Sequence, residues 1–171
     1  MWTRKPNHQS RIWIFCDGGL GLADYRNLPA GDEAHPAPGA PAALHLQAGC
    51  AALVRNDTGA VLDWAWRTLP TVTSVEAEYA GLLLGIELAA RHPSLQTIFV
   101  LDSEVVVGQM TGRYAVNSHN LRRWHQRATA AIEPLPGVGF RAVPRAWNAL
   151  ADALARQAGL PWAQLRAALE E

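Results

Sequence analysis

Two short apolar runs, each ending in an aspartate, constrain the fold of this chain more than any other feature. Residues 11–16 read Arg-Ile-Trp-Ile-Phe-Cys before Asp17, and residues 97–101 read Thr-Ile-Phe-Val-Leu before Asp102. Such runs, rich in β-branched and aromatic residues, are typical of strands buried on both faces of a sheet. In an open α/β sheet the carboxyl ends of neighbouring strands border the ligand crevice, so both aspartates are expected to face it. A turn or capping role is the alternative for either aspartate alone.

A helix expected over about residues 74–92 distinguishes two glutamates. Glu76 and Glu78 are two positions apart and therefore lie about 200° apart around the helix. Glu76 is in line with Glu87 and Arg91, which are spaced for an i,i+4 ion pair on a solvated face. Glu78 shares its stripe with apolar residues that should pack on the sheet, where a carboxylate needs a donor, a cation or a metal. The preference of acids for helix starts is the alternative explanation.

The remaining elements complete an α/β pattern. Two strands joined by a turn precede the first helix, over 48–56 and 61–69. Two helices, a strand and another helix follow Asp102, over 103–110, 116–132, 138–143 and 149–158. The last of these helices carries a fourth acid, Asp152, which is also spaced for an i,i+4 ion pair with Arg156.

Length and composition are those of one globular domain. The 171 residues are 49% hydrophobic, which is enough for a sizeable core. The expected single domain, 1–171, has a polar tail over 1–10, an insertion rich in proline, glycine and alanine over 20–47, and a closing helix over 161–171. No stretch resembles a signal peptide or a membrane span, and the two cysteines lack metal-ligand spacing, which predicts buried thiols, no membrane partner and a cytoplasmic setting.

The net charge of zero conceals an uneven distribution of arginines. Fifteen basic and fifteen acidic residues cancel, but six arginines and a single glutamate fall between Glu104 and Asp152. This local excess predicts a basic surface beside an acidic site. A solvated helix face is the plainer alternative.

In this order, the elements and acids resemble the type 1 ribonuclease H family. The segments that carry the resemblance are Phe15–Gly19, Glu76–Leu82, Leu101–Val107 and Val143–Ala155. The resemblance implies an RNase H-like α/β fold, with a mixed five-stranded sheet of three antiparallel strands and then two parallel ones, flanked by helices. It also implies an endonuclease that hydrolyses the RNA strand of an RNA–DNA hybrid and leaves a 5′-phosphate and a 3′-hydroxyl.

By the same resemblance, four acids are catalytic and bind metal, namely Asp17, Glu78, Asp102 and Asp152. Clustered carboxylates suit Mg²⁺, with Mn²⁺ as an alternative, because hard cations take oxygen ligands and leave positions for water and phosphate. Two such ions would activate the attacking water and stabilise the departing 3′ oxygen. Contacts to the nucleic acid are implied at Gly18, Gly19, Ser74, Ser103, Asn120, Arg122, Arg123, Arg145 and Asn148.

The chain departs from the family pattern in three places. The 20–47 insertion replaces the short segment that usually follows the Asp-Gly turn. Ser74-Val75 stands where many members carry two asparagines, which removes side-chain amides that could reach the nucleic acid. The loop histidine that assists product release in several members has no clear match. Arg141 and Arg145 are the candidates to replace its charge, although neither can carry its proton.

Two other functions stay open from the sequence. One is a non-catalytic nucleic-acid-binding domain of the same fold, which the retention of all four acids disfavours. The other is a different nuclease of this fold, such as a junction resolvase or an exonuclease, which cleavage of a plain hybrid would distinguish. A small-molecule enzyme is disfavoured because the chain has no glycine-rich phosphate loop and no Ser-His-Asp arrangement.

Overall fold

The computed structural model describes residues 11–23, 45–70 and 72–156, with the backbone alone described for 20–23 and 45–47. In chain order the elements are β1 Ile12–Ala23, β2 His45–Asn56, β3 Val61–Leu69, α1 Ser74–Ala89, β4 Thr97–Leu101, α2 Glu104–Met110, α3 His119–Ile132, β5 Val138–Ala142 and α4 Ala149–Arg156. A 3-10 helix, Arg145–Asn148, leads directly into α4. The element order is the one that the sequence predicts.

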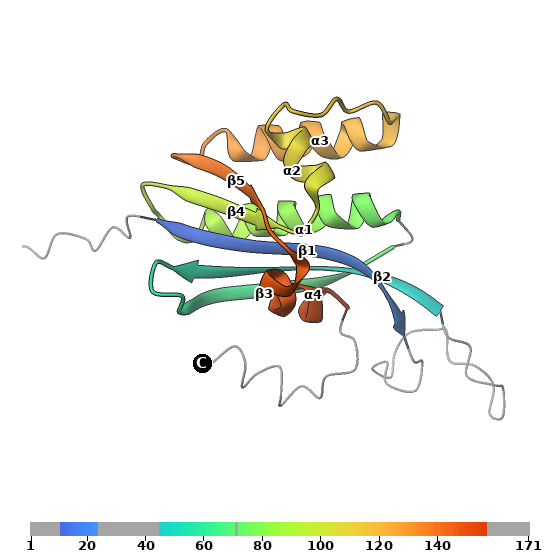
Figure 1. The fold of residues 1–171 in the computed structure, drawn as a ribbon, viewed down its shortest axis with the longest axis horizontal. Helices are drawn as coiled ribbons and strands as arrows, with labels where there is room; N and C mark the ends of the chain where they lie inside the picture. The colour runs from blue at the N-terminus through green and yellow to red at the C-terminus, as the bar shows by residue number, and fades with distance from the viewer. Residues whose placement is uncertain (1–10, 24–44, 71, 157–171) are drawn as a thin grey trace, which may run out of the picture.

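The strands form one mixed sheet in the order β3-β2-β1-β4-β5 (Figure 1). β1 pairs antiparallel with β2, and β2 pairs antiparallel with β3. β4 runs parallel to β1, and β5 runs parallel to β4. The predicted sheet of three antiparallel strands followed by two parallel ones is confirmed, and β1 is its central strand.

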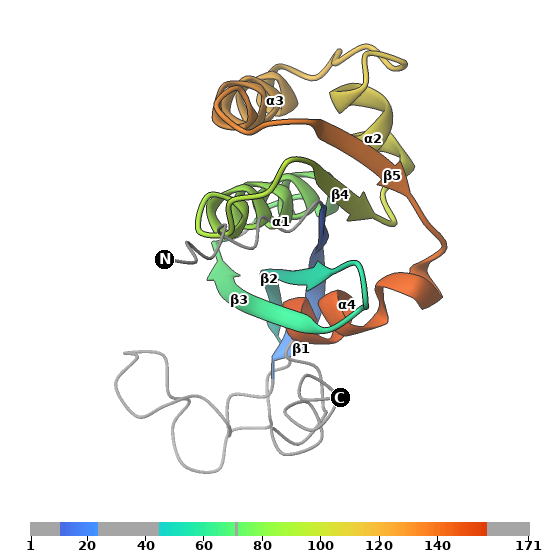
Figure 2. The same ribbon diagram turned by 90° about the vertical axis from the view of Figure 1, so that its left-hand side faces the viewer.

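Helices cover both faces of the sheet (Figure 2). α1 packs on β1 and β2 from one side, and α3 packs on α1. α4 packs on β1, β2 and β3 from the other side. The larger core, on the α1 side, includes Ile14, Leu82 and Phe99, and the smaller core under α4 includes Leu53 and Leu154. Because α1 is enclosed between the sheet and α3, it is apolar around most of its circumference.

β1 is longer than the sequence predicts. The expected strand ends at Asp17, but the ladder with β2 continues unbroken to Ala23. Gly18 and Gly19 suggest a turn because glycine is a poor strand former. Here the pairing with β2 and the close approach of α1 outweigh that preference. Asp17 therefore lies within a strand, whereas Asp102 does follow the last residue of β4.

The expected insertion over 20–47 has different bounds in the structure. β1 runs to Ala23 and β2 begins at His45, so both ends of the expected loop belong to the sheet. Three expected segments lie outside the described residues, namely 1–10, 24–44 and 161–171. Within the described ranges, no helix is both long enough and apolar enough to cross a membrane. Cys16 and Cys50 are buried free thiols, as predicted.

Glycines bring the backbone of α1 into contact with that of β1. A Cβ atom on Gly18 would lie 1.8 Å from the carbonyl oxygen of Ala77 in α1. A Cβ atom on Gly81 in α1 would lie 2.3 Å from the carbonyl oxygen of Asp17. Neither position admits a side chain, so the helix lies closer to the strand than ordinary side-chain packing permits.

α1 begins with a capping box that uses Glu76. The Thr73 side chain accepts a hydrogen bond from the Glu76 backbone, and the Glu76 carboxylate accepts one from the Thr73 backbone at 2.8 Å. The predicted Glu87–Arg91 ion pair is wrong. Glu87 instead forms a bidentate salt bridge with Arg67 of β3, at 3.0 and 2.6 Å, because the neighbouring strand presents a guanidinium in better geometry than the next helical turn.

We predict that Gly49→Ala lowers the free energy of unfolding by about 1–3 kcal/mol, the usual cost of overpacking. A Cβ atom on Gly49 in β2 would lie 2.0 Å from the carbonyl oxygen of Ala155 in α4, and a backbone atom cannot move without shifting the helix. Urea unfolding should show a lower midpoint at an unchanged slope. Gly139→Ala is the matched control, because its Cβ would meet only the flexible Cδ1 atom of Ile98 at 2.9 Å. Equal midpoints for the two variants would contradict this packing of α4.

Candidate metal centre

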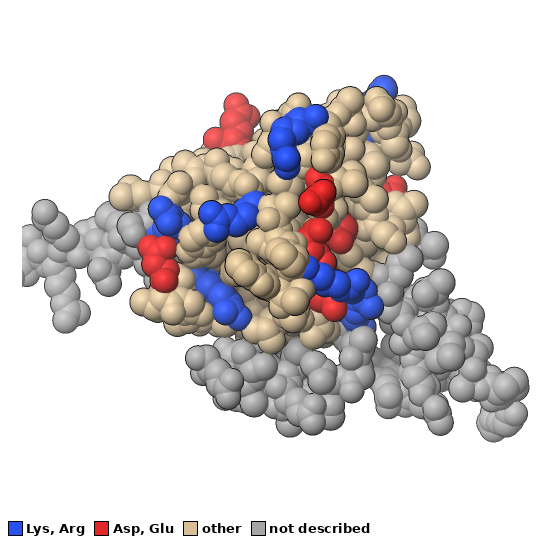
Figure 3. Space-filling view, in the orientation of Figure 1, with Lys and Arg blue, Asp and Glu red and all other residues tan. Residues whose placement is uncertain are grey.

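Three of the four predicted acids meet at one point. Asp17 of β1, Glu78 of α1 and Asp102 after β4 each place a carboxylate oxygen within 4.8 Å of the other two. Asp17 is 3% exposed, and the other two acids are half-buried. Figure 3 shows acidic side chains gathered in a group on the visible face of the molecule, with basic side chains beside them. The cluster is therefore reachable from solvent although its innermost member is buried.

The ends of the strands explain why these acids converge. Pairing between β1 and β4 stops at Phe15 and Val100, so β1 extends beyond its parallel neighbour from Asp17 onwards. Asp102 leaves the end of β4 beside this extension of β1. Glu78 arrives from α1, whose backbone touches β1 at the same level. Three separate elements thus deliver one carboxylate each.

Two donors of the chain hold these acids in place. The backbone N–H of Gly18 donates a hydrogen bond to the Glu78 carboxylate. Asn148 is fully buried, and its Nδ2 donates to the Cys16 carbonyl at 2.8 Å and to Asp102 Oδ1 at 3.1 Å. The sequence placed Gly18 and Asn148 among the nucleic-acid contacts, whereas the structure turns both of them toward the acids.

The positioning role of Asn148 was missed by reasoning from the sequence. A usable signal was present, because Asn148 and Asp152 are four residues apart and therefore lie on the same side of a helical segment. A buried amide one turn before a predicted metal-binding acid is well placed to orient another acid from behind.

Asp152 lies at the rim of the cluster and is held by two arginines. Arg145 Nη2 lies 2.5 Å from Asp152 Oδ1, and Arg156 Nε lies 2.8 Å from the same oxygen. The i,i+4 pair that the spacing suggested is therefore present. Asp152 nevertheless lies close enough to Asp17 for its charge to raise the Asp17 pKa. Of the two arginines considered as replacements for a loop histidine, Arg145 is at the acids and Arg141 is on β5.

Burial and mutual repulsion raise the pKa of two of the acids. Burial, followed by the charges of Asp102 and Asp152, raises the pKa of Asp17 to about 8. Burial, followed by the charges of Asp17 and Asp102, raises the pKa of Glu78 to about 9. The Arg145 guanidinium acts in the opposite direction on both pKa values. The Arg145 charge therefore offsets the repulsion among the acids only in part.

This donor set fits a hard divalent cation. Asp17 Oδ2 and Glu78 Oε2 are buried without a hydrogen-bond partner among the residues that the structure describes. Carboxylate oxygens are the ligands that Mg²⁺ and Mn²⁺ prefer, and a divalent charge would relieve the repulsion that raises the two pKa values. Asp17, Glu78 and Asp102 are therefore the residues that can hold a metal ion here.

Three of the other predicted nucleic-acid contacts lie close to the acids in the chain. Ser74 is exposed in the first turn of α1. Ser103 caps α2 and accepts a hydrogen bond from the Val106 backbone at 3.4 Å. Gly19 is buried, and a Cβ atom there would lie 3.6 Å from the Arg156 side chain. Only Ser74 thus presents an unobstructed side chain to solvent.

Two of the α3 candidates lie beside Glu76, in the first turn of α1. Asn120 and Arg123 line a cavity of about 400 Å³ together with Glu76, Trp124 and Arg127. The Arg127 guanidinium lies over the Trp124 ring, 5.6 Å from its centroid. Arg122 turns away and donates to two carbonyl groups of the preceding loop. Of the six arginines in the predicted basic surface, Arg123 and Arg127 thus line this cavity on α3.

Comparison with known proteins gives a consistent result. A family model described as reverse transcriptase-like matches residues 39–158. The bifunctional protein Rv2228c of Mycobacterium tuberculosis is 32% identical over 102 residues, which are 60% of this chain and 28% of that protein. A ribonuclease HI of Halobacterium salinarum is 35% identical over 106 residues, which are 62% of this chain and 53% of that protein. The matched region thus spans about half or less of the length of these relatives.

Solved structures show the same likeness. The N-terminal RNase H domain of Rv2228c superposes with a TM-score of 0.67 at 26% identity, covering 93% of this chain and 96% of that one. RNase H1 of Halobacterium salinarum gives a TM-score of 0.66 at 26% identity, covering 85% and 94%. LC11-RNase H1, a protein isolated from compost, was solved in complex with an RNA/DNA hybrid. It superposes with a TM-score of 0.64 at 26% identity, covering 84% of this chain and 92% of that one.

We predict that Asp17→Asn stabilises the metal-free protein at high pH and not at low pH. The Asp17 pKa of about 8 in the folded protein exceeds its ordinary value of about 4, so the folded state keeps a proton that the unfolded chain releases. The contribution of this group to stability is complete below about pH 4 and is lost as the pH rises toward 8. The variant escapes this loss, so its free energy of unfolding at pH 8 should exceed that of the parent by on the order of a few kcal/mol. Urea unfolding with a chelator at pH 4.5 and pH 8 tests this, and a difference independent of pH would contradict it.

Proposed function

Because the chain belongs to the reverse transcriptase-like family and is ribonuclease HI-like, we propose that it hydrolyses the RNA strand of RNA–DNA hybrids in a metal-dependent reaction. The observation that carries the proposal is the convergence of Asp17, Glu78 and Asp102 on one solvent-accessible point. Phosphodiester hydrolysis by hard cations needs clustered oxygen ligands with room for water and phosphate. The hybrid bound to LC11-RNase H1 supports the choice of substrate.

The three converging acids are the proposed ligands, and Asp152 is the proposed fourth. Two bound divalent ions would supply an activated water and charge stabilisation for the departing 3′ oxygen, leaving a 5′-phosphate and a 3′-hydroxyl. The raised pKa values mean that Asp17 and Glu78 release protons when a cation binds. Asn148 holds Asp102 in its orientation through one hydrogen bond and anchors itself to β1 through the other.

Arg145 has a proposed role at the scissile phosphate. Its guanidinium is exposed and contacts Asp152 Oδ1, so it sits between the acid cluster and solvent. Arginine binds phosphate oxygens through parallel hydrogen bonds, and it keeps its charge at every relevant pH. We assign to Arg145 the electrostatic part of the missing histidine's role and no part in proton transfer.

The cavity at α3 is the proposed site for the phosphates of the opposite strand. Asn120 and Arg123 line it, and Arg127 and Trp124 stack beside them. Such a site would set the register of the duplex, while selection for RNA requires contact with the 2′-hydroxyl. Ser74, exposed at the start of α1, is the proposed residue for such a contact.

We predict metal-dependent cleavage of an end-labelled RNA–DNA hybrid, in the RNA strand, with Mg²⁺ or Mn²⁺. Asp102→Asn should lower the rate by at least about a hundredfold, because it removes a charged ligand and with it several kcal/mol of charge stabilisation. Duplex DNA, duplex RNA, a four-way junction and single strands serve as alternative substrates. Hybrid binding without any cleavage would favour a binding domain of the same fold. Preferential cutting of junctions would favour another nuclease of this fold.

We predict that Asn148→Asp weakens metal binding by about 10–100-fold, the usual effect of losing a residue that orients a metal ligand. The change keeps the size of the side chain, removes the donor to Asp102 Oδ1 and adds a negative charge behind it. Calorimetric titration with Mn²⁺ measures the affinity directly, and the metal dependence of hybrid cleavage provides the second readout. Asn117→Asp makes the same chemical change at an exposed position and should leave the metal affinity unchanged. Equal affinities for the two variants would remove Asn148 from the site.

A further inference from the structure

The sheet face beside α4 carries an unusual group of arginine and aromatic side chains. Trp13, Phe15 and Asp17 alternate along β1, so all three project from the same face of the sheet. α4 covers the strands on one side of this row, where the smaller core lies. We call the remaining group, Trp13, Phe15, Arg55, Arg141 and Trp147, the arginine–aromatic surface.

The arginines of this surface lie over its aromatic rings. The Arg55 guanidinium is 5.4 Å from the centroid of Phe15, and the Arg141 guanidinium is 5.3 Å from the centroid of Trp13. A third guanidinium, that of Arg11, lies 5.5 Å from the Trp13 centroid. Contacts of this kind fix the plane of each guanidinium while leaving its N–H groups available at the edges.

The register of the sheet places the two arginines on either side of the aromatic row. Arg55 of β2 is the cross-strand partner of Trp13, and its guanidinium reaches along the strand to Phe15. Arg141 of β5 pairs with Val100 of β4, which pairs in turn with Phe15. The positive charges therefore flank a strip of aromatic rings that runs along β1 toward Asp17.

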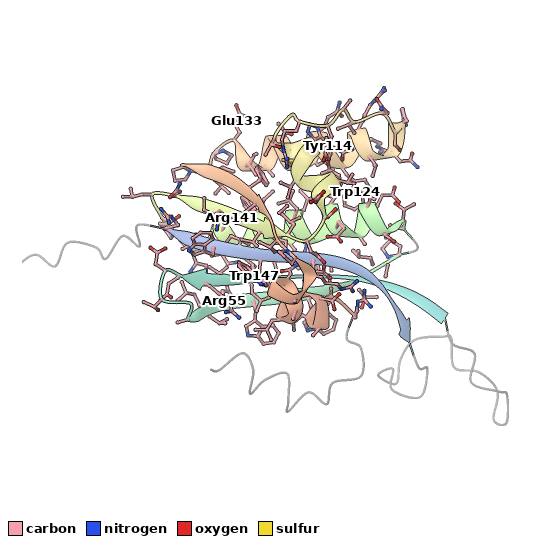
Figure 4. The ribbon with its side chains drawn as sticks, in the orientation of Figure 1. Arg55, Tyr114, Trp124, Glu133, Arg141 and Trp147 are labelled. Carbon is pink, nitrogen blue, oxygen red and sulfur yellow. The ribbon has the colours of Figure 1, made fainter. Side chains whose placement is uncertain are left out.

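Trp147 extends the surface toward the acids. It is 72% exposed and lies in the 3-10 helix between Arg145, which contacts Asp152, and Asn148, which holds Asp102. Figure 4 labels Arg55, Arg141 and Trp147 around the strands on which α4 lies. Along β1, Phe15 and Trp13 are two and four residues from Asp17, or about 7 and 13 Å. The arginine–aromatic surface is thus continuous with the metal centre.

Phe15 packs against the smaller core and Trp13 donates a hydrogen bond to Asp57, but stability does not account for Trp147. A tryptophan exposed to this extent gains little from burial, and large exposed aromatic groups commonly mark interaction sites. Neither Arg55 nor Arg141 has a carboxylate partner among the residues that the structure describes. Both guanidinium groups keep hydrogen-bond donors and a full charge for a ligand.

We propose that the arginine–aromatic surface binds single-stranded nucleic acid extending from a duplex held at the metal centre. The location of that duplex rests on the proposed function, whereas binding of a single strand to the surface does not. The exposed Trp147 ring and the planar guanidinium groups of Arg55 and Arg141 can accept stacked bases, and the arginine N–H groups can bind phosphates. Together these are the usual features of a recognition site for single strands. An acidic protein segment would match the positive charge, but it would offer no planar group to pack on the Trp147 ring or on the guanidinium groups of Arg55 and Arg141.

Fluorescence anisotropy of the full chain with a labelled single-stranded oligodeoxythymidylate, in a chelator to prevent cleavage, tests the proposal directly. The double variant Arg55→Gln, Arg141→Gln should weaken binding roughly tenfold. The slope of log K against log salt concentration should become shallower by about 1.4, because each phosphate contact to a single strand contributes about 0.7. Trp147→Ala should weaken binding roughly tenfold through lost stacking, and Trp147→Phe should restore most of it. Arg91→Gln removes an exposed arginine beside Asp63 on the α1 side and should have no effect.

The same variants are then compared on two hybrids, one blunt and one with a single-stranded extension. The proposal predicts that the extension tightens binding by the parent protein and that the surface variants lose this gain while still binding the blunt hybrid. Unchanged binding of single strands and extended hybrids by all the variants would overturn it, as would a preference for an acidic peptide over the oligonucleotide. Loss of single-strand binding in the surface variants of a protein that cuts no hybrid would support the surface and reject the proposed function.

Discussion

The direct contact between the backbones of β1 and α1 is the constraint on which the site depends. Gly18 and Gly81 leave no room for side chains between the strand and the helix. This proximity lets a carboxylate on α1 reach the same point as one on β1, and it lets the Gly18 N–H donate to Glu78. A side chain at either glycine would separate the two elements and with them two of the proposed ligands. Gly18, which weakens β1 as a strand, and Gly81 of α1 are thus the residues that make the metal centre possible.

Bringing these acids together creates an electrostatic cost that the protein offsets only in part. Burial and repulsion raise the pKa of Asp17 to about 8 and that of Glu78 to about 9, although Gly18, Asn148 and Arg145 all supply donors or positive charge. A site selected for stability would replace such acids with apolar residues or complete ion pairs. Two buried oxygens without partners, among the described residues, instead mark a place where a cation completes the structure.

Most of the fold follows from local patterns, and the differences have physical causes. The apolar runs and the helix periods predict the elements and the separation of Glu76 from Glu78, and the resemblance to the type 1 ribonuclease H family implies how the strands form one sheet. The extension of β1 through two glycines could not be predicted, because it depends on pairing with β2 and on contact with α1 rather than on propensity. The pairing of Glu87 with Arg67 likewise depends on a neighbouring strand.

The sequence is less informative about where individual polar side chains point. Residue type and order identify the acids, but they do not say which polar neighbours face inward. Asn148 reads as a nucleic-acid contact in the sequence, and only the packing of the 3-10 helix against β1 reveals that its amide is buried against Cys16 and Asp102. Conversely, Arg141 is close in sequence to Arg145, yet β5 carries it to the ring of Trp13 while Arg145 remains at the acids.

The zero net charge of the chain conceals a separation of charge in space. Three of the fifteen acids meet at the metal centre, and arginines on β2, β5 and α3 lie on separate surfaces around it. Lys5 is the single lysine among fifteen basic residues. A lysine ammonium could neutralise a phosphate, but it is not planar, so it offers no flat surface on which a base could stack. At Arg55, over Phe15, and at Arg141, over Trp13, arginine therefore supplies a planar group with several N–H donors as well as a charge.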